Sequence, residues 1–252
     1  MQKNKSTIDQ DEVNKFSAMS DEWWNIEGKF KPLHKFNPCR LRYIKKKIIE
    51  HFSLKNNSLK SLDGLKIIDI GCGGGLVAEP IANMGANVIA IDASKENIEI
   101  AKIHAKESNL DIDYRQTSIE DMSKKYNNSF DVVLALEIIE HVASVDSFIK
   151  ECSRLLKPNG LILIATLNRT IKSLITAKFG AEYILKWLPI GTHNWQKFLK
   201  PYEILKKAEQ EDLVFKEICG FKYNFLKDEW SKSRNNDVNY ILVFSKKSTK
   251  DN

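Results

Sequence analysis

Short apolar runs alternate along this chain with stretches in which apolar residues recur at helical spacing. Four runs predict strands at residues 65–70, 86–91, 130–136 and 160–167, and residues 111–115 indicate a shorter strand. The runs at 130–136 and 160–167 are nearly continuously apolar, which is typical of strands covered on both faces. The pattern therefore predicts a parallel sheet between layers of helices.

Helical spacing occurs between these runs, at residues 76–84, 95–108 and 145–156. The third helix is expected to end at the sequence Lys-Pro-Asn-Gly of residues 157–160, which is typical of a helix stop and a turn. Strands that alternate with helices in this way indicate a doubly wound α/β sheet.

Residues 213–221 and 238–244 predict two more strands, with no convincing helix between them. These strands would form an antiparallel hairpin at one edge of the sheet. The predicted fold is therefore α/β, a doubly wound sheet that is mostly parallel and has an antiparallel edge strand. A chain of 252 residues is long enough for one such domain with additions.

Two regions lie outside the alternation, residues 9–52 before the first strand and residues 168–200 after the fifth. Ligands of open α/β sheets bind outside the carboxyl ends of the strands. We therefore expect both regions to cover that edge. On this basis the chain divides into an N-terminal helical cap, residues 1–60, and a main domain, residues 61–252, which carries an insertion at 168–200.

The composition is that of a soluble globular protein, with 42% hydrophobic and 29% charged residues and a net charge of +6. The lysines are dispersed, and no dense Arg/Lys block with interleaved aromatics indicates nucleic-acid binding. The 4 cysteines form no C-x-x-C pair, so neither a zinc site nor a disulfide framework is predicted, which fits a reducing cytosol. Neither a secretory signal nor an apolar run of about 18 residues is present.

A glycine-rich loop, Gly71-Cys72-Gly73-Gly74-Gly75, follows the first strand and precedes a helix. Glycines allow a main chain to turn tightly and to approach a ligand, and strand, loop and helix in this order are typical of a nucleotide site. Asp92 ends the next strand, 21 positions after Gly71. That is about the separation at which a carboxylate meets the two hydroxyls of a ribose.

The residues around the loop indicate which nucleotide cofactor it would bind. A dinucleotide fingerprint needs a small residue where Leu76 stands, which counts against an NAD-dependent oxidoreductase. Asp69, two residues before Gly71, suits a ligand that carries a positive amine. The loop therefore resembles the first motif of the S-adenosylmethionine-dependent methyltransferases.

A second candidate constellation follows the strand at 130–136, where the sequence reads Glu137-Ile138-Ile139-Glu140-His141. Glu137 and Glu140 are three residues apart and share one face of a helical turn. Together with His141 they would hold a divalent cation such as Mg²⁺, Mn²⁺ or Zn²⁺. From the residues alone the alternative stays open, namely a loop glutamate and a histidine that orients a substrate, acts as a general base or packs.

Longer motifs resemble one methyltransferase family, the ubiquinone-biosynthesis O-methyltransferases. The most specific are W-W-N-I-E-G-K-F-K-P-L-H at residues 23–34 and G-A-E-Y-I-L at residues 180–185. The similarity covers roughly residues 13–244. Further matching runs lie at residues 37–44, 69–75, 137–141, 166–169, 191–193 and 237–240.

The resemblance implies a class I methyltransferase sheet that uses S-adenosylmethionine. The implied reaction is methylation of two catechol-type hydroxyls, one on a polyprenyl phenol and one on a demethylated ubiquinol. The expected cofactor contacts, with the loop included, are Arg40, Asp69, Gly71, Gly73, Asp92 and Leu136. The family commonly has methionine where this chain has Leu136, and because the swap conserves volume we expect the contact to persist.

The resemblance also associates Glu137, Glu140 and His141 with a divalent cation, for which Mg²⁺ is the leading candidate, and makes them the expected catalytic residues. A phenol with a pKa of about 10 is a poor nucleophile at neutral pH, because it stays protonated. A cation beside the hydroxyl would stabilise the phenolate, or His141 would remove the proton as a general base.

Residues 168–188 combine apolar residues at helical spacing with Trp187 and three lysines. By themselves they indicate a lid helix. With a polyprenyl substrate implied, they predict a helix that lies on an anionic membrane surface, and hence a cytoplasmic protein peripherally bound to the inner face of the membrane. Alternatives that stay open are another small phenol or amine as substrate, and a non-catalytic subunit. A ubiquinone-synthesis complex is a further possible partner.

Overall fold

The structure is a computed structural model, and it describes residues 6–55, 58–174, 195–224 and 226–248. In these residues 8 strands form one sheet with the order β3-β2-β1-β4-β5-β8-β6-β7. The strands are β1 Lys66–Ile70, β2 Asn87–Asp92, β3 Asp113–Gln116, β4 Phe130–Leu136, β5 Leu156–Leu167, β6 Leu213–Asn224, β7 Glu229–Ser233 and β8 Asn239–Lys246.

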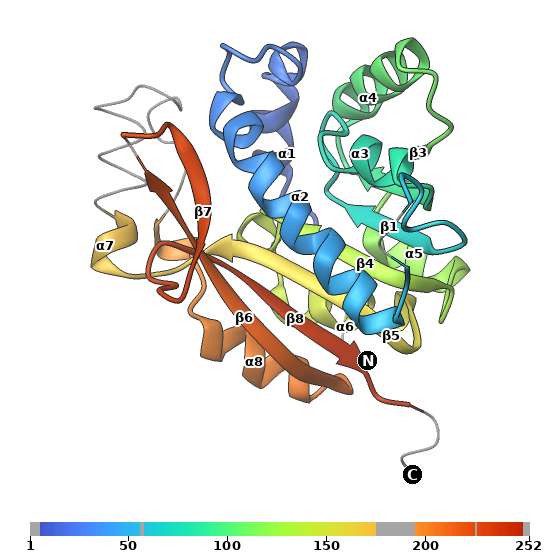
Figure 1. Cartoon of the computed structure of the whole chain (residues 1–252), viewed down its shortest axis with the longest axis vertical. Helices are drawn as coiled ribbons and strands as arrows, with labels where there is room; N and C mark the ends of the chain where they lie inside the picture. The colour runs from blue at the N-terminus through green and yellow to red at the C-terminus, as the bar shows by residue number, and fades with distance from the viewer. Residues whose placement is uncertain (1–5, 56–57, 175–194, 225, 249–252) are drawn as a thin grey trace.

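α-Helices and short 3-10 helices surround this sheet (Figure 1). The α-helices are α1 Gln10–Ser17, α2 Lys31–Phe52, α3 Ala78–Asn83, α4 Lys95–Glu107, α5 Ile119–Lys125, α6 Val145–Leu155, α7 Ile171–Ser173 and α8 Pro201–Glu209. The 3-10 helices are η1 Ser20–Glu22, η2 Ile139–His141 and η4 Trp195–Lys197. The helices expected at 76–84, 95–108 and 145–156 correspond to α3, α4 and α6.

The predicted α/β sheet is confirmed. Strands β3, β2, β1, β4 and β5 are parallel neighbours, as the alternation of strands with helices predicts. Strand β8 is antiparallel to β5, with Leu163 opposite Val243, and antiparallel to β6, with Ile218 opposite Leu242. The sequence did not predict β7, which pairs with β6 and ends the sheet. Its residues, Glu-Trp-Ser-Lys-Ser, carry a single apolar side chain, too few for a recognisable pattern.

Successive residues of the central strands pack against opposite helix layers. Ile67 and Leu134 belong to the cluster under α2, α3 and α4, whereas Ile68 and Val133 belong to the cluster under α5, α6 and α8. Figure 1 shows α2 across one face of the sheet and α8 on the other. Because both faces are covered, the strands need no polar alternation, which explains their continuous apolar runs.

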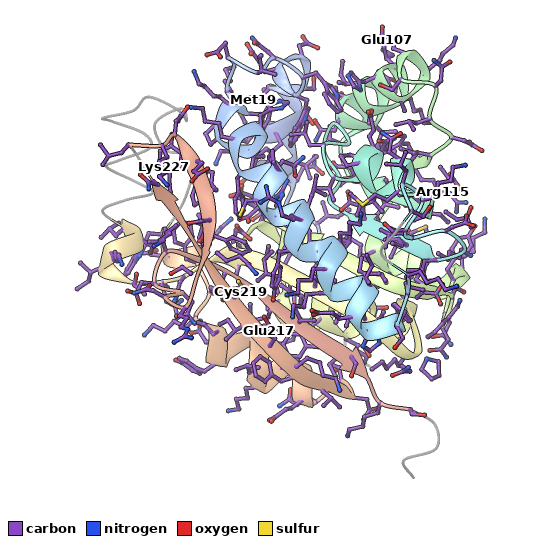
Figure 2. The ribbon with its side chains drawn as sticks, in the orientation of Figure 1. Met19, Glu107, Arg115, Glu217, Cys219 and Lys227 are labelled. Carbon is purple, nitrogen blue, oxygen red and sulfur yellow. The ribbon has the colours of Figure 1, made fainter. Side chains whose placement is uncertain are left out.

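Helix α2 is part of the core. Ile44 and Ile48 are fully buried against the sheet, and each contributes roughly 1.5–3 kcal/mol by removal from water. Glu217 of β6, which is labelled in Figure 2, accepts from Tyr43 of α2 at 3.2 Å and pairs with Lys47 of α2 at 2.5 Å. The N-terminal segment is thereby held against the sheet, while the division at residues 60 and 61 stays a prediction.

The insertion at 168–200 is only partly described. It begins with the single turn of α7 and resumes at η4, so most of the predicted membrane-facing helix lies outside the described residues. Ile171 at its start is 74% exposed. None of the helices in the described part of the chain is long and apolar enough to cross a membrane.

Candidate active site

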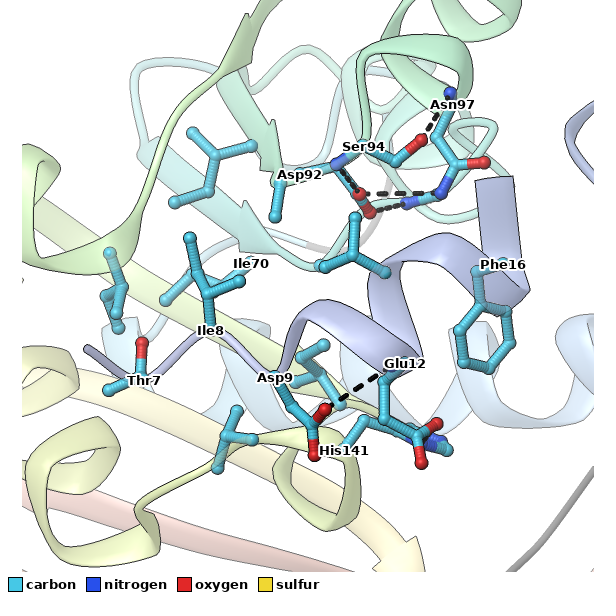
Figure 3. Close-up of a pocket in the computed structure, with 18 of the residues that line it drawn as sticks. Thr7, Ile8, Asp9, Glu12, Phe16, Ile70, Asp92, Ser94, Asn97 and His141 are labelled. Atoms are coloured by element: carbon cyan, nitrogen blue, oxygen red, sulfur yellow. Dashed lines mark hydrogen bonds and ion pairs between the residues drawn. The ribbon is translucent and has the colours of Figure 1, made fainter. Parts of the chain in front are cut away.

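The carboxyl ends of β1, β2 and β4 open onto a pocket of about 130 Å³ (Figure 3). This is the edge at which open α/β sheets bind ligands. Its walls come from the N-terminal segment at 7–16, the glycine loop, the turn after β2 at 92–97, residues 117–119 and the turn after β4 at 137–142. Gly71, Gly73 and Asp92 of the first constellation and Glu137 and His141 of the second therefore line one pocket under α1. The other predicted site residues, Arg40, Asp69, Leu136 and Glu140, are not part of its lining.

Asp92 is fixed at the pocket wall by main-chain and side-chain donors. Its Oδ2 accepts from the main chain of Gly73 at 2.9 Å, and its Oδ1 accepts from the main chain of Ser94 at 2.8 Å and from Asn97 at 3.4 Å. Burial raises the pKa of Asp92, and these hydrogen bonds oppose the rise. The carboxylate is thus oriented before any ligand binds, as the recognition of a ribose requires.

The glycine loop is packed closely against neighbouring side chains as well as lining the pocket. Gly73 has φ +53, and a Cβ there would lie 2.3 Å from the Trp23 ring; at Gly74 it would lie 2.5 Å from Trp23. A Cβ at Gly71, φ +71, would lie 2.7 Å from Ile138. The glycines are therefore required by the neighbouring side chains as well as by the approach to a ligand.

Trp23 links the N-terminal segment to Asp92. Its indole donates to Asn97 at 2.8 Å, and its ring stacks on Phe30 at 3.7 Å. Trp23 therefore packs within the N-terminal segment and also lines the pocket. Leu76, which excludes the dinucleotide fingerprint, is buried in the same cluster.

A buried charged group lies beside the glycine loop. Arg40 and Asp69 are each 3% exposed, and Arg40 interacts electrostatically with Asp69 and Glu137. Arg40 is oriented by donating to Asn37 at 2.9 Å. The Oδ2 atom of Asp69 is buried without a partner, and burial raises the pKa of Asp69 to about 7 despite Arg40. An unpartnered acceptor next to a guanidinium suits a ligand with both an ammonium and a carboxylate group.

The two glutamates after β4 stand in a strained, poorly solvated turn. Glu137 has φ +55, a left-handed conformation that is unusual outside glycine. Burial, followed by the charge of Glu140, raises the pKa of Glu137 to about 8. Glu140 is 4% exposed; its Oε2 accepts from Thr166 at 2.9 Å, whereas its buried Oε1 has no partner. Burial also raises the pKa of Glu140.

His141 contacts α1. Its Nδ1 lies 2.9 Å from Oε2 of Glu12, and its ring is edge-on to Phe16 at 5.0 Å. Among the residues described, no group of three or more His, Cys, Asp and Glu side chains is placed to hold a metal ion. The carboxyl oxygens of Glu137 and Glu140 suit a hard cation chemically, but His141 does not converge with them in this arrangement.

Comparison with known proteins identifies the family of this chain. A model of the methyltransferase domain matches residues 68–164. The ubiquinone biosynthesis O-methyltransferase of Pelagibacter ubique is 51% identical over 241 residues, which cover 96% of this chain and 99% of that protein. That of Bartonella bacilliformis is 53% identical, with 96% and 97% covered. The chain belongs to the ubiquinone biosynthesis O-methyltransferases. The resemblance seen in residues 23–34 and 180–185 is thereby confirmed.

Solved structures agree with the class I methyltransferase fold. The magnesium protoporphyrin IX methyltransferase of Synechocystis, with S-adenosylhomocysteine bound, superposes with a TM-score of 0.66 at 16% identity, over 94% of this chain and 100% of that one. The same enzyme with S-adenosylmethionine gives 0.62 at 15% identity. At such identities the likeness supports the fold of this ubiquinone biosynthesis O-methyltransferase and leaves its contacts to its own residues.

Several pocket residues of this methyltransferase were missed by sequence reasoning. Ser94 and Asn97 follow Asp92 as the cap and first turn of α4, a signal that the sequence Asp-x-Ser-x-x-Asn carries. Glu12 had no such signal, because its partner lies 129 residues away. Leu136, one of the predicted cofactor contacts, ends β4, where it is buried opposite Ala165.

Proposed function

We propose that this chain transfers a methyl group from S-adenosylmethionine to hydroxyl groups of polyprenylated catechol-type intermediates of ubiquinone biosynthesis, at both O-methylation steps. The observation that carries the proposal is identity of about half over 96% of the chain to proteins named for this role. The structure supports it independently, because a ribose-type carboxylate, Asp92, lines the pocket, and a buried ammonium-type acceptor, Asp69, directly precedes the pocket-lining Ile70.

Each group of S-adenosylmethionine has a candidate partner among these residues. Asp92 would bind the ribose hydroxyls, with Gly71 and Gly73 allowing close approach. The orphaned oxygen of Asp69 would accept from the α-ammonium, and Arg40 would bind the α-carboxylate. Leu136 would supply an apolar contact at the end of β4. When bound, S-adenosylmethionine supplies a methyl group on a positively charged sulfur.

The remaining chemistry is proton removal and alignment of the acceptor. We infer that His141 takes the phenol proton through Nε2, because Nδ1 is engaged by Glu12. Holding the hydroxyl in line with the methyl group removes much of the entropic barrier to transfer. Phe16 and Ile138 line the pocket and exclude water from the reacting groups.

A divalent cation belongs to the proposal as well. Mg²⁺ suits the carboxyl oxygens of Glu137 and Glu140, whose mutual repulsion a cation would relieve. His141 is the third expected ligand, a role that its Nε2 would fill in place of the role of base and not together with it. A bound cation would stabilise the phenolate by its charge. The unpartnered Oε1 of Glu140 supports a ligand at this position.

A polyprenyl substrate places the reaction next to lipid. We propose peripheral attachment to an anionic membrane surface through residues 168–188, on the cytoplasmic side. At the described end of this segment Ile171 is exposed, and Lys172 beside it pairs with Asp237. A ubiquinone-synthesis complex is a further proposed partner, and nucleic acid is not one. Co-sedimentation with anionic and neutral vesicles tests attachment; no binding to anionic vesicles at low salt would refute it.

The deciding experiment is transfer from labelled S-adenosylmethionine to a short-tail demethylated ubiquinol and to a short-tail polyprenyl catechol, with and without a chelator. Product that depends on metal supports the acceptor and the cation together. Product that survives chelation supports the acceptor and rejects the cation. Cofactor binding without transfer to either catechol rejects the proposed function in favour of another phenol or amine acceptor.

A further inference from the structure

A network of charged side chains joins three segments that are distant in the sequence. Oε2 of Glu12 on α1 contacts Nδ1 of His141 at 2.9 Å, and Oε1 of the same carboxylate accepts from Lys197 of η4 at 3.0 Å. Lys197 also donates to Asp9, the N-cap of α1, at 3.0 Å. Glu12 thus lies between a candidate catalytic histidine, which Figure 3 shows beside it, and η4 near the end of the insertion.

The Glu12 carboxylate is partly desolvated and strongly engaged. Its side chain is 15% exposed and that of His141 is 9% exposed. Both of its oxygens are engaged by nitrogen groups, Oε1 by the ammonium of Lys197 and Oε2 by Nδ1 of His141, and this pairing favours the ionised carboxylate. An ionised carboxylate has acceptors only, so the hydrogen between the two groups must sit on Nδ1 of His141.

Helix α1 is held in place by contacts that do not involve His141. The main chain of Thr7 donates to Glu120 at 2.5 Å, and its carbonyl accepts from Ala143 at 2.9 Å. At the other end of the helix Ser17 donates to Ser94 at 2.7 Å. Because both ends are anchored, Glu12 is presented to His141 by a fixed scaffold, which is what orientation of a reacting group requires.

We propose that Glu12 is a positioning residue that fixes the ring orientation and the tautomer of His141, and that Lys197 fixes the carboxylate in turn. The tautomer with hydrogen on Nδ1 leaves Nε2 as the nitrogen that acts on the acceptor hydroxyl. This inference rests on the proposed function, because His141 acts in that reaction. It assigns to α1 a part of the active site that neither sequence motif contains.

Substitution Glu12→Gln tests the tautomer directly. Lys197 is only a donor, so it would retain the amide oxygen, and the amide NH₂ would then face His141 and donate to Nδ1. We expect the hydrogen to move to Nε2. Adding Lys197→Met releases the amide, which can rotate and accept from Nδ1 again. The double variant is therefore expected to regain part of what the single variant loses.

The first readout is the ring nitrogen spectrum of ¹⁵N-labelled protein at about pH 8, above the ordinary pKa of histidine. Long-range ¹H–¹⁵N correlations distinguish a nitrogen that carries hydrogen from one that does not, and His141→Asn identifies the signals. We expect Nδ1–H in the wild type and Nε2–H in Glu12→Gln. The same tautomer in both proteins would overturn the proposal, whether or not any acceptor is methylated.

The second readout is kinetic. We expect Glu12→Gln to lower kcat about 10- to 100-fold, as for impaired proton transfer, with KM for S-adenosylmethionine changed less than about 3-fold. In the His141→Asn background the same substitution should have no further effect. Equal loss in both backgrounds, or a rise in KM alone, would show a structural role and overturn the proposal. Glu27→Gln, which removes an exposed pair with Lys31 in the same cap, is the matched control.

A failure of the proposed function is distinguishable from a failure of this inference. If the wild type methylates neither catechol, the function falls, and the spectra alone decide whether Glu12 sets the tautomer of His141. If the wild type is active and Glu12→Gln retains its kcat, the function stands and the positioning role falls.

Discussion

The buried carboxyl of Asp69 makes the affinity for S-adenosylmethionine depend on pH in a calculable way. Burial raises the pKa of Asp69 to about 7 in the free protein, with Arg40 opposing and Asp92 adding to the rise. A ligand ammonium favours the ionised carboxylate, so binding lowers this pKa and releases a proton. The complex therefore holds fewer protons than the free protein, and affinity rises with pH.

The size of the effect follows from the ionised fraction. With a pKa of about 7, roughly 3% of Asp69 is ionised at about pH 5.5 and about half at pH 7. If only the ionised form binds tightly, Kd falls about 15-fold over this range. We limit this estimate to pH values up to 7, because the α-amino group of the ligand itself loses its proton at about pH 7.7–8.0. Above that value the opposite trend begins.

Isothermal titration of S-adenosylmethionine at a series of pH values, in buffers of different ionisation enthalpy, measures both Kd and the protons released. Asp69→Asn should bind more weakly at about pH 7 and lose most of the slope. Burial also raises the pKa of Glu137, to about 8, and that of Asp92, and both groups remain in that variant, so a small residual slope is expected from them. A flat profile in the wild type, or the same slope in Asp69→Asn, would refute the assignment.

Three further substitutions test the packing around the cofactor pocket. Gly73→Ala should lower the free energy of unfolding by about 1–3 kcal/mol more than Gly64→Ala, measured by urea denaturation, because both have positive φ but only Gly73 faces the Trp23 ring. Trp23→Phe should raise Kd for S-adenosylmethionine about 3- to 10-fold, since it removes the donor to Asn97; an unchanged Kd would contradict the link to Asp92. Leu136→Met should leave kcat/KM within about 2-fold, and a larger change would show that the contact is shape-specific.

The parts of the fold that sequence predicted are those whose signal is local. Continuous apolar runs identified β1, β2, β4 and β5 because burial on both faces removes polar alternation. The antiparallel pairing of β6 with β8 could be inferred because no helix separates them. Strand β7 could not be predicted, because its polar sequence has no strand pattern and its conformation depends on the pairing with β6.

The site divides in the same way. The acidic residues at or just after strand ends, Asp69, Asp92 and Glu137, could be predicted because a parallel sheet brings such ends to one edge. Asp92 and Glu137 line the pocket there, whereas Asp69 is buried and does not. The expectation that His141 joins the two glutamates was reasonable from spacing, but the turn after β4 directs its Nδ1 to a carboxylate 129 residues earlier. No pattern within a short window encodes that contact.

The chemistry of His141 therefore depends on how the N-terminal segment docks. A histidine whose Nδ1 hydrogen is held by a carboxylate has one ring nitrogen committed, so the remaining one serves either as a base or as a metal ligand, and not as both at once. The carboxylate comes from α1, which also closes the pocket over the glycine loop. Closure of the cofactor pocket and orientation of the candidate base are consequently one structural event, which gives α1 a reason to be anchored at both ends.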